Sequence, residues 1–147
     1  MPDERPVLFC FDGSTQARAA VEEAGRQLEH GRRAIVATVW SPAEQTSFVG
    51  AAVEVPVGFD DQVAARAMEV AEAGAKLVGA AGFEATPVVA RTTDSIWRAL
   101  VTLADEHEAG LVVLGSHGRT GLSEVLLGSV AAAVTQHTAR PVLVVHA

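Results

Sequence analysis

Residues 111–136 read LVVLGSHGRTGLSEVLLGSVAAAVTQ, and this stretch decides how the chain can be interpreted. Four glycines fall within the fourteen positions from 115 to 128, between an apolar run at 111–114 and another at 129–134. A turn needs only one or two glycines, so this number indicates that another group comes close to the backbone. The run LVVL is apolar at every position, as expected for a central parallel strand covered on both faces.

The spacing of the glycines favours an anion as that group. Gly115 and Gly118 follow the strand, and neither has a Cβ that would keep a bulky anion from the main chain. Gly128 and Ser129 open the next helix, whose unpaired N–H groups and positive dipole end attract negative charge, and the Ser129 hydroxyl adds a donor. We therefore predict a phosphate site, with an ordinary strand-to-helix loop as the alternative. No Lys-Ser or Lys-Thr follows a glycine loop, which argues against a Walker-type phosphate-transfer enzyme.

Strand and helix patterns alternate along the chain. Short apolar runs predict strands at 6–12, 34–40, 86–91, 111–114 and 142–145. Helical spacing predicts helices at 14–28, at 63–80, at 129–138, and from a cap at Asp94 or Thr93 to 107. The alternation predicts an α/β fold with one domain over residues 1–147. We expect an open five-stranded parallel sheet with helices on both faces.

Ligands of such a sheet bind beyond the carboxyl ends of its strands, so the loops there contain the candidate residues. Asp12 ends the first strand, where it can either cap the following helix beside Ser14 or contact a ligand. Residues 41–59 show no clean period and form a connection long enough to act as a functional lid. His117 and Arg119 are candidates for phosphate contact in an exposed loop. Neither has a companion nucleophile or carboxylate at a recognisable spacing, and no histidine pair has metal-ligand spacing.

The composition limits the partners and the compartment. The net charge is −7, and residues 41–84 contribute −5 of it from seven carboxylates and two cations, which disfavours nucleic acid and anionic lipid. The apolar runs are far shorter than the roughly 20 residues that span a membrane. The acidic start MPDERPVLFCF is unlike a secretory signal, and the single cysteine, Cys10, is expected to be a small core side chain. We expect a cytoplasmic protein.

Three segments closely resemble the universal stress protein family, in its ATP-binding branch. They are FDGS at 11–14, GSHGRTGLSEVLLGS at 115–129 and RPVLVV at 140–145, and the likeness covers essentially the whole chain. The resemblance implies a parallel sheet in the strand order three, two, one, four, five, with ATP or a related adenine nucleotide in its crevice. It also implies a homodimer through residues 141–146, which would cover an apolar sheet edge.

The resemblance also assigns nucleotide contacts by position. Asp12 would contact the nucleotide near the ribose or adenine, and the backbone at Val39 would meet the adenine edge. Ribose and phosphates would be held by Gly115, Gly118, Gly128, Ser129 and the Val130 amide, and Ser14 and Arg119 complete the set of expected binding residues. A bound Mg²⁺ or Mn²⁺ would bridge phosphate oxygens.

The function that this resemblance implies is a nucleotide-dependent sensor or regulator of the stress response, with a regulatory protein as partner. Two alternatives stay open: slow ATP hydrolysis with His117 or Arg119 stabilising charge, and a nucleotide-free dimeric interaction module. The chain departs from the common family pattern at Thr92-Thr93, at Gly110, where an aspartate is frequent, and at Glu124. The spaced glycines themselves are all present.

Overall fold

A computed structural model describes residues 3–42, 59–117 and 127–146. The elements in chain order are β1 (Val7–Cys10), α1 (Thr15–Gln27), β2 (Arg33–Trp40), α3 (Phe59–Ala80), β3 (Glu84–Arg91), α4 (Ile96–Glu106), β4 (Leu111–Gly115), α5 (Ser129–His137) and β5 (Val142–Val145). The strands form a five-stranded sheet in the order β3-β2-β1-β4-β5, and every neighbouring pair is parallel. The predicted fold class and strand order are confirmed.

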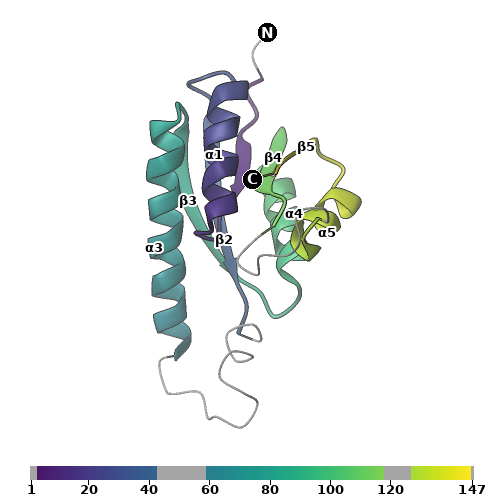
Figure 1. Cartoon of the computed structure of the whole chain (residues 1–147). Helices are drawn as coiled ribbons and strands as arrows, with labels where there is room; N and C mark the ends of the chain where they lie inside the picture. The colour runs from purple at the N-terminus through teal and green to yellow at the C-terminus, as the bar shows by residue number, and fades with distance from the viewer. Residues whose placement is uncertain (1–2, 43–58, 118–126, 147) are drawn as a thin grey trace.

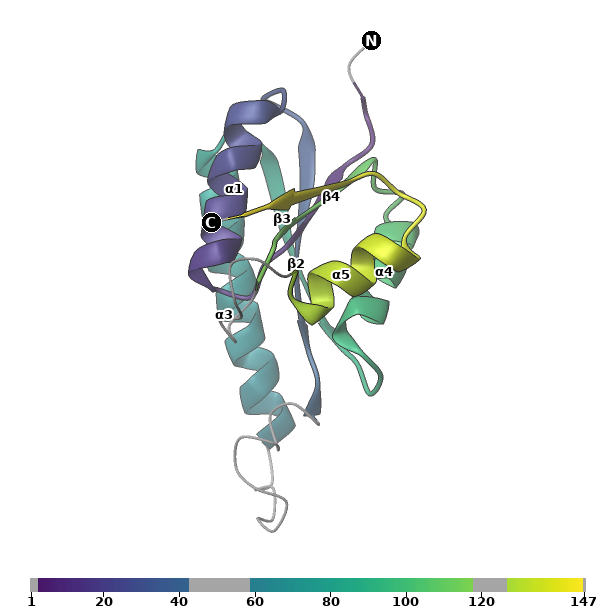
Figure 2. The same ribbon diagram turned by 45° about the vertical axis from the view of Figure 1, so that its right-hand side comes forward.

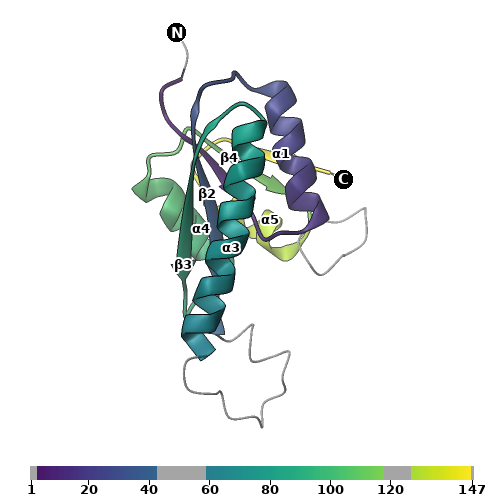
Figure 3. The ribbon, with the colours of Figure 1, turned by 90° about the vertical axis from the view of Figure 1, so that its left-hand side faces the viewer.

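Two helical layers enclose the sheet, with α1 and α3 on one face and α4 and α5 on the other (Figures 1 and 2). Figure 3 shows α3 running along the sheet in front of β2 and β3. Successive strand residues point to opposite faces, so Val7 and Phe9 pack on the α1 side while Leu8 packs on the α4 side. All three side chains are buried, which explains why β1 is apolar at every position.

The helix ends agree with the sequence analysis at α1 and differ at α4. Ser14 caps α1 as predicted, because the Ala17 N–H donates to its Oγ at 3.1 Å. The N-cap of α4 is Ser95, and its side chain makes no capping bond, so the predicted cap at Asp94 or Thr93 is wrong. The Asp94 carboxylate accepts the neighbouring Ser95 N–H at 2.8 Å and pairs with Arg98 at 3.0 Å. These contacts occupy the carboxylate, which therefore does not cap the first turn of α4.

The start of α3 also differs from the prediction. It begins at Phe59, four residues before the periodic apolar pattern starts at Val63. Asp60 and Asp61 stand in its first turn, where negative charge is favoured by the helix dipole, and an apolar period alone does not detect this signal. Most of the expected lid at 41–59 lies outside the described residues. No helix in the described part of the chain is long and apolar enough to cross a membrane.

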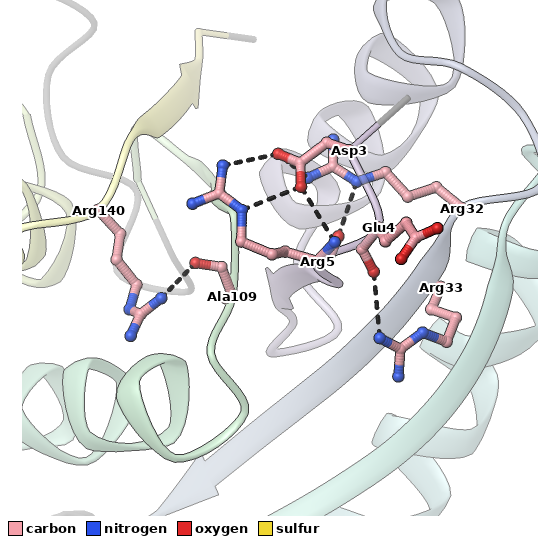
Figure 4. A network of polar contacts seen from close by, with 7 residues as sticks. All are labelled: Asp3, Glu4, Arg5, Arg32, Arg33, Ala109 and Arg140. Carbon is pink, nitrogen blue, oxygen red and sulfur yellow. Dashed lines mark hydrogen bonds and ion pairs between the residues drawn. The ribbon is translucent and has the colours of Figure 1, made fainter. Parts of the chain in front are cut away.

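Polar side chains link neighbouring segments at the amino edge of the sheet (Figure 4). Asp3 Oδ2 accepts from Arg5 Nη2 at 2.7 Å and lies 3.3 Å from Arg32 Nη2. Arg32 Nε donates to the Arg5 carbonyl at 2.9 Å, and Arg140 Nη1 donates to the Ala109 carbonyl at 2.6 Å. These contacts fasten the segment before β1 to the start of β2, and the start of β5 to the start of β4.

The contacts of Asp3 predict a pH-dependent contribution to stability. Hydrogen bonds from Arg5, together with the charge of Arg32, hold the pKa of the Asp3 carboxyl well below its usual range. A lowered folded-state pKa gives stabilisation that is present above the unfolded value of about 3.9 and is lost as the pH falls below it. We expect Asp3→Asn to reduce the free energy of unfolding at pH 7 and to have a smaller effect at pH 3, as measured by urea unfolding. An equal loss at both pH values would show that charge does not carry the contribution.

Candidate functional site

The candidate site lies where β1 and β4 meet at the centre of the sheet. Their register pairs Val7 with Leu111 and Phe9 with Val113, so the segments that follow both strands leave the sheet side by side. The strand order reverses direction between β1 and β4. The chain goes from β1 to α1 on one face, and α5, the next described helix after β4, lies on the other face. This is a topological switch point, where open α/β sheets bind ligands.

Strand β2 directs main-chain groups into this crevice. The last pairing of β1 with β2 joins Cys10 to Ala37, and the Ala37 carbonyl accepts the Phe11 N–H at 2.9 Å. Alternate residues of a strand direct their main-chain groups to the same side, so Val39 directs its N–H and carbonyl to the side of β1, beyond the point where β1 ends. Thr38 Oγ1 donates to the Phe11 carbonyl at 2.8 Å and holds the two strand ends together. The Val39 backbone therefore faces the crevice.

Asp12 and Ser14 form the turn that begins α1. Asp12 Oδ1 accepts the Ser14 N–H at 2.9 Å in the turn before the helix, and the capping bond itself is made by Ser14. The Asp12 carboxylate also contributes, after burial, to raising the pKa of the Cys10 thiol to about 12. Cys10 therefore stays protonated and packs as a small apolar side chain, as predicted. The contact of Asp12 with a ligand stays a prediction.

The two described glycines of the spaced set lie against the protein's own main chain. A Cβ on Gly115 would lie 3.0 Å from the main-chain carbon and oxygen of Gln16 in α1, and one on Gly128 would lie 3.0 Å from the Ser116 carbonyl oxygen. At both glycines, the group that comes close to the backbone in this structure is therefore another part of the protein's own main chain. Gly118 and Arg119 lie outside the described residues.

The amino end of α5 borders a hollow of about 240 Å³. Gly128 is the N-cap and provides no side-chain cap, so the N–H groups in the first turn of α5 have no side-chain acceptor among the described residues. The hollow is lined by residues from the end of β2 and from the starts of α4 and α5, namely Ser41, Asp94, Ser95, Ile96, Trp97, Ser129 and Val130. Ser129 and Val130 were predicted from the sequence. Ser41 and the residues around the start of α4 were not among the site residues predicted from the sequence, where Asp94 was considered only as a cap.

His117 is placed differently from the prediction. It was expected in an exposed loop, but its side chain is buried, with 7% of the residue accessible. Its Nδ1 lies 3.1 Å from Ser116 Oγ, while its Nε2 is buried and has no hydrogen-bond partner in the described part of the chain. The close contact between β4 and the N-cap of α5 buries the residue, and this tertiary contact cannot be seen in a glycine-rich sequence.

The fold and this crevice define a doubly wound α/β protein with its site at the switch point. Residues 4–146 match the family model of the universal stress protein family. Universal stress protein Rv1636 of Mycobacterium tuberculosis is 31% identical over 147 residues, covering 97% of this chain and 96% of that protein. The chain belongs to the universal stress protein family.

Solved structures agree with this assignment. The structure of hypothetical protein MJ0577, known from Methanocaldococcus jannaschii, has a TM-score of 0.75 at 24% identity and covers 97% of this chain and 95% of that one. A universal stress protein in complex with cAMP has a TM-score of 0.60 at 27% identity, with 97% of each chain covered. The universal stress protein from Archaeoglobus fulgidus in complex with dAMP has a TM-score of 0.65 at 20% identity, with 95% and 96% covered.

The contact at Gly115 predicts a loss of stability that is independent of any ligand. We expect Gly115→Ala to lower the free energy of unfolding by about 1–3 kcal/mol, because the added Cβ meets helix backbone, which cannot turn aside as a side chain can. Gly79→Ala in α3 is the control, since a Cβ there meets nothing within 4 Å. It should be neutral or stabilising by up to about 1 kcal/mol. Urea unfolding without nucleotide measures both; unchanged stability of Gly115→Ala would contradict the packing role.

Proposed function

We propose that this protein binds an adenine nucleotide, ATP foremost, in the crevice between β1 and β4, and acts as a nucleotide-dependent sensor or regulator of the stress response. The observation that carries the proposal is the uncapped amino end of α5, which begins at the Gly128-Ser129 step of the spaced glycine pattern and borders the hollow. Unpaired N–H groups and a positive dipole end attract phosphate before any cationic side chain such as Arg119 contributes.

The ligand class is supported by two structural neighbours. One is a universal stress protein in complex with cAMP and the other a universal stress protein in complex with dAMP, so both ligands are adenine nucleotides with a phosphate group. Preference for ATP rests on the likeness of the glycine pattern to the ATP-binding branch of the family. We therefore place ATP first and AMP or a cyclic nucleotide second.

The binding roles that we propose follow the likeness to the family. The Val39 backbone would meet the adenine edge, and Asp12 would contact the ribose or adenine beside the turn that it forms with Ser14. The phosphates would lie at the amino end of α5. Within the proposed set, the residues around ribose and phosphates are Gly115, Gly118, Arg119, Gly128, Ser129 and Val130.

A divalent cation would be held mainly by the phosphates themselves. The described residues contain no group of three or more histidine, cysteine, aspartate or glutamate side chains that could hold a metal ion. Phosphate oxygens are hard ligands that Mg²⁺ or Mn²⁺ prefers, and the cation would neutralise charge that the protein leaves unpaired. We propose Mg²⁺ or Mn²⁺ as a companion of bound ATP, without protein ligands of its own among the described residues.

The assembly that we propose is a cytoplasmic homodimer formed through residues 141–146. Strand β5 stands at one edge of the sheet, and most of its residues are only partly buried. Pairing with its own copy would satisfy the free row of main-chain groups and cover the valines. Nucleotide occupancy would then change the surface that the dimer presents to a regulatory protein partner. Sedimentation at micromolar concentration tests the dimer, and a monomer there would exclude it.

A charge placed at the amino end of α5 tests the nucleotide site without weakening the fold. Ser129→Asp puts a carboxylate where the phosphates would lie, and an acidic residue in the first turn stabilises a helix. We expect ATP affinity measured by calorimetry to fall more than roughly tenfold, with thermal stability without ligand equal or higher. Ser129→Asn is the matched neutral control and should bind ATP within roughly threefold of the wild type.

The ligand itself is identified from the purified protein. Denaturation, followed by anion-exchange chromatography and mass analysis of the supernatant, should release ATP. Protein that releases no nucleotide and gives no calorimetric signal with ATP, AMP or cAMP would overturn the proposed function. Normal ATP binding by Ser129→Asp would instead show that the phosphates do not bind at the amino end of α5.

A further inference from the structure

The ring of His117 lies against the amino end of α5. A Cβ built on Gly128, the N-cap, would lie 3.4 Å from the His117 Cα and 3.9 Å from its Cδ2, the ring carbon bonded to Nε2. The Gly128 N–H donates to the Ser116 carbonyl at 2.7 Å and keeps the two segments together. The ring of His117 therefore lies beside the N-cap of α5.

The two ring nitrogens of His117 have different surroundings. Nδ1 lies 3.1 Å from the hydroxyl of Ser116, a residue that is 1% exposed. Nε2 is buried and unpartnered among the described residues. In a neutral imidazole one nitrogen donates and the other accepts, and the hydrogen bond at one nitrogen fixes the role of the other. If the Ser116 hydroxyl donates to Nδ1, then Nε2 carries the proton and is a donor.

The hydroxyl of Ser116 can set that tautomer, and no described group pairs with Nε2 in either one. The first-turn N–H groups of Ser129 and Val130 have no intrahelical acceptor, and the N-cap provides none. With the proton on Nε2, that buried N–H and the first-turn N–H groups have no acceptor among the described residues outside the helix. A buried donor without an acceptor carries a desolvation penalty, and native proteins retain few of them.

We propose that His117 donates a hydrogen bond from Nε2 to the phosphate of the bound nucleotide, with Ser116 fixing the donating tautomer. The inference rests on the proposed function, because one phosphate group at the amino end of α5 would accept both from Nε2 and from the first-turn N–H groups. His117 recognises the phosphate and not the base or the ribose. It thereby favours nucleotides over nucleosides.

A comparison of AMP with adenosine isolates this contact, since the two ligands differ only in the phosphate. In His117→Leu the donor is lost at similar volume, whereas His117→Gln keeps an amide N–H that can reach the position of Nε2. Calorimetry should show that the preference for AMP over adenosine falls roughly tenfold or more in His117→Leu and is largely kept in His117→Gln. Adenosine affinity should stay unchanged in both. Because each ratio is taken within one variant, a general loss of folded protein cancels.

The outcomes separate this inference from the proposed function. A wild-type protein that binds neither AMP nor ATP would overturn both. A wild-type protein that binds AMP, with a His117→Leu variant whose preference for AMP is unchanged, would overturn only the role of His117. An equal loss of AMP and adenosine affinity in His117→Leu would also overturn it, since that result would mark a purely structural residue.

The tautomer gives a second readout that needs no variant at the ring. Nitrogen-15 NMR of the histidine-labelled wild-type protein should show His117 with its proton on Nε2, and the Nε2 resonance should shift with AMP and not with adenosine. Ser116→Ala removes the partner of Nδ1 and should reduce both the share of this tautomer and the preference for AMP. A proton found on Nδ1 in the wild-type protein would refute the assignment.

Discussion

The parallel pairing of β1 with β4 at the centre of the sheet is the constraint on which the rest of the structure depends. It brings together two strands whose chains continue toward helices on opposite faces, so nothing in the sheet itself closes the gap beyond them. Within the described part of the chain, the Val39 backbone lies beyond the last pairing of β1 with β2, and the amino end of α5 has no side-chain cap. The central pairing also requires α1 to lie close over β4, and a residue without a Cβ at Gly115 permits this. The pairing of β1 with β4 is therefore required both by the fold and by the candidate site.

The strands could be predicted from the sequence because each needs only a local signal. A strand buried on both faces must be apolar throughout, and the runs containing Val7 and Val112 have no polar position to suggest a surface. The order of the strands came instead from the likeness to a family, since periodicity carries no information on which strands pair. Helix starts were predicted less well. At α4 the carboxylate of Asp94 is used by its neighbour and by Arg98, and a pattern of cap residues does not reveal such competition.

The misplaced parts of the site share a physical cause, which is contact between segments far apart in sequence. His117 stands among glycines, yet contact with the N-cap of α5 buries it. The hollow combines the end of β2 with the starts of α4 and α5, and no single segment indicates it.

Contact between distant segments is also found at Gly110, where the chain departs from the family pattern. A Cβ there would lie 2.8 Å from Arg32 Nη2 and 2.9 Å from Asp3 Oδ2, so its absence makes room for an ion pair between two other segments.

Charge is distributed unevenly between the two edges of the sheet, and the distribution determines how an anion would be held. At the amino edge, arginines pair with Asp3 or with main-chain carbonyls and fix the ends of the chain. At the carboxyl edge, the hollow is lined by hydroxyls, apolar side chains and Asp94, with no lysine or arginine among its described residues. Oriented N–H groups in a partly desolvated crevice interact strongly with a phosphate and need little reorganisation, whereas exposed cations are screened by salt. A protein with a net charge of −7 would thus hold its anion by fixed dipoles at short range and gain little from long-range attraction.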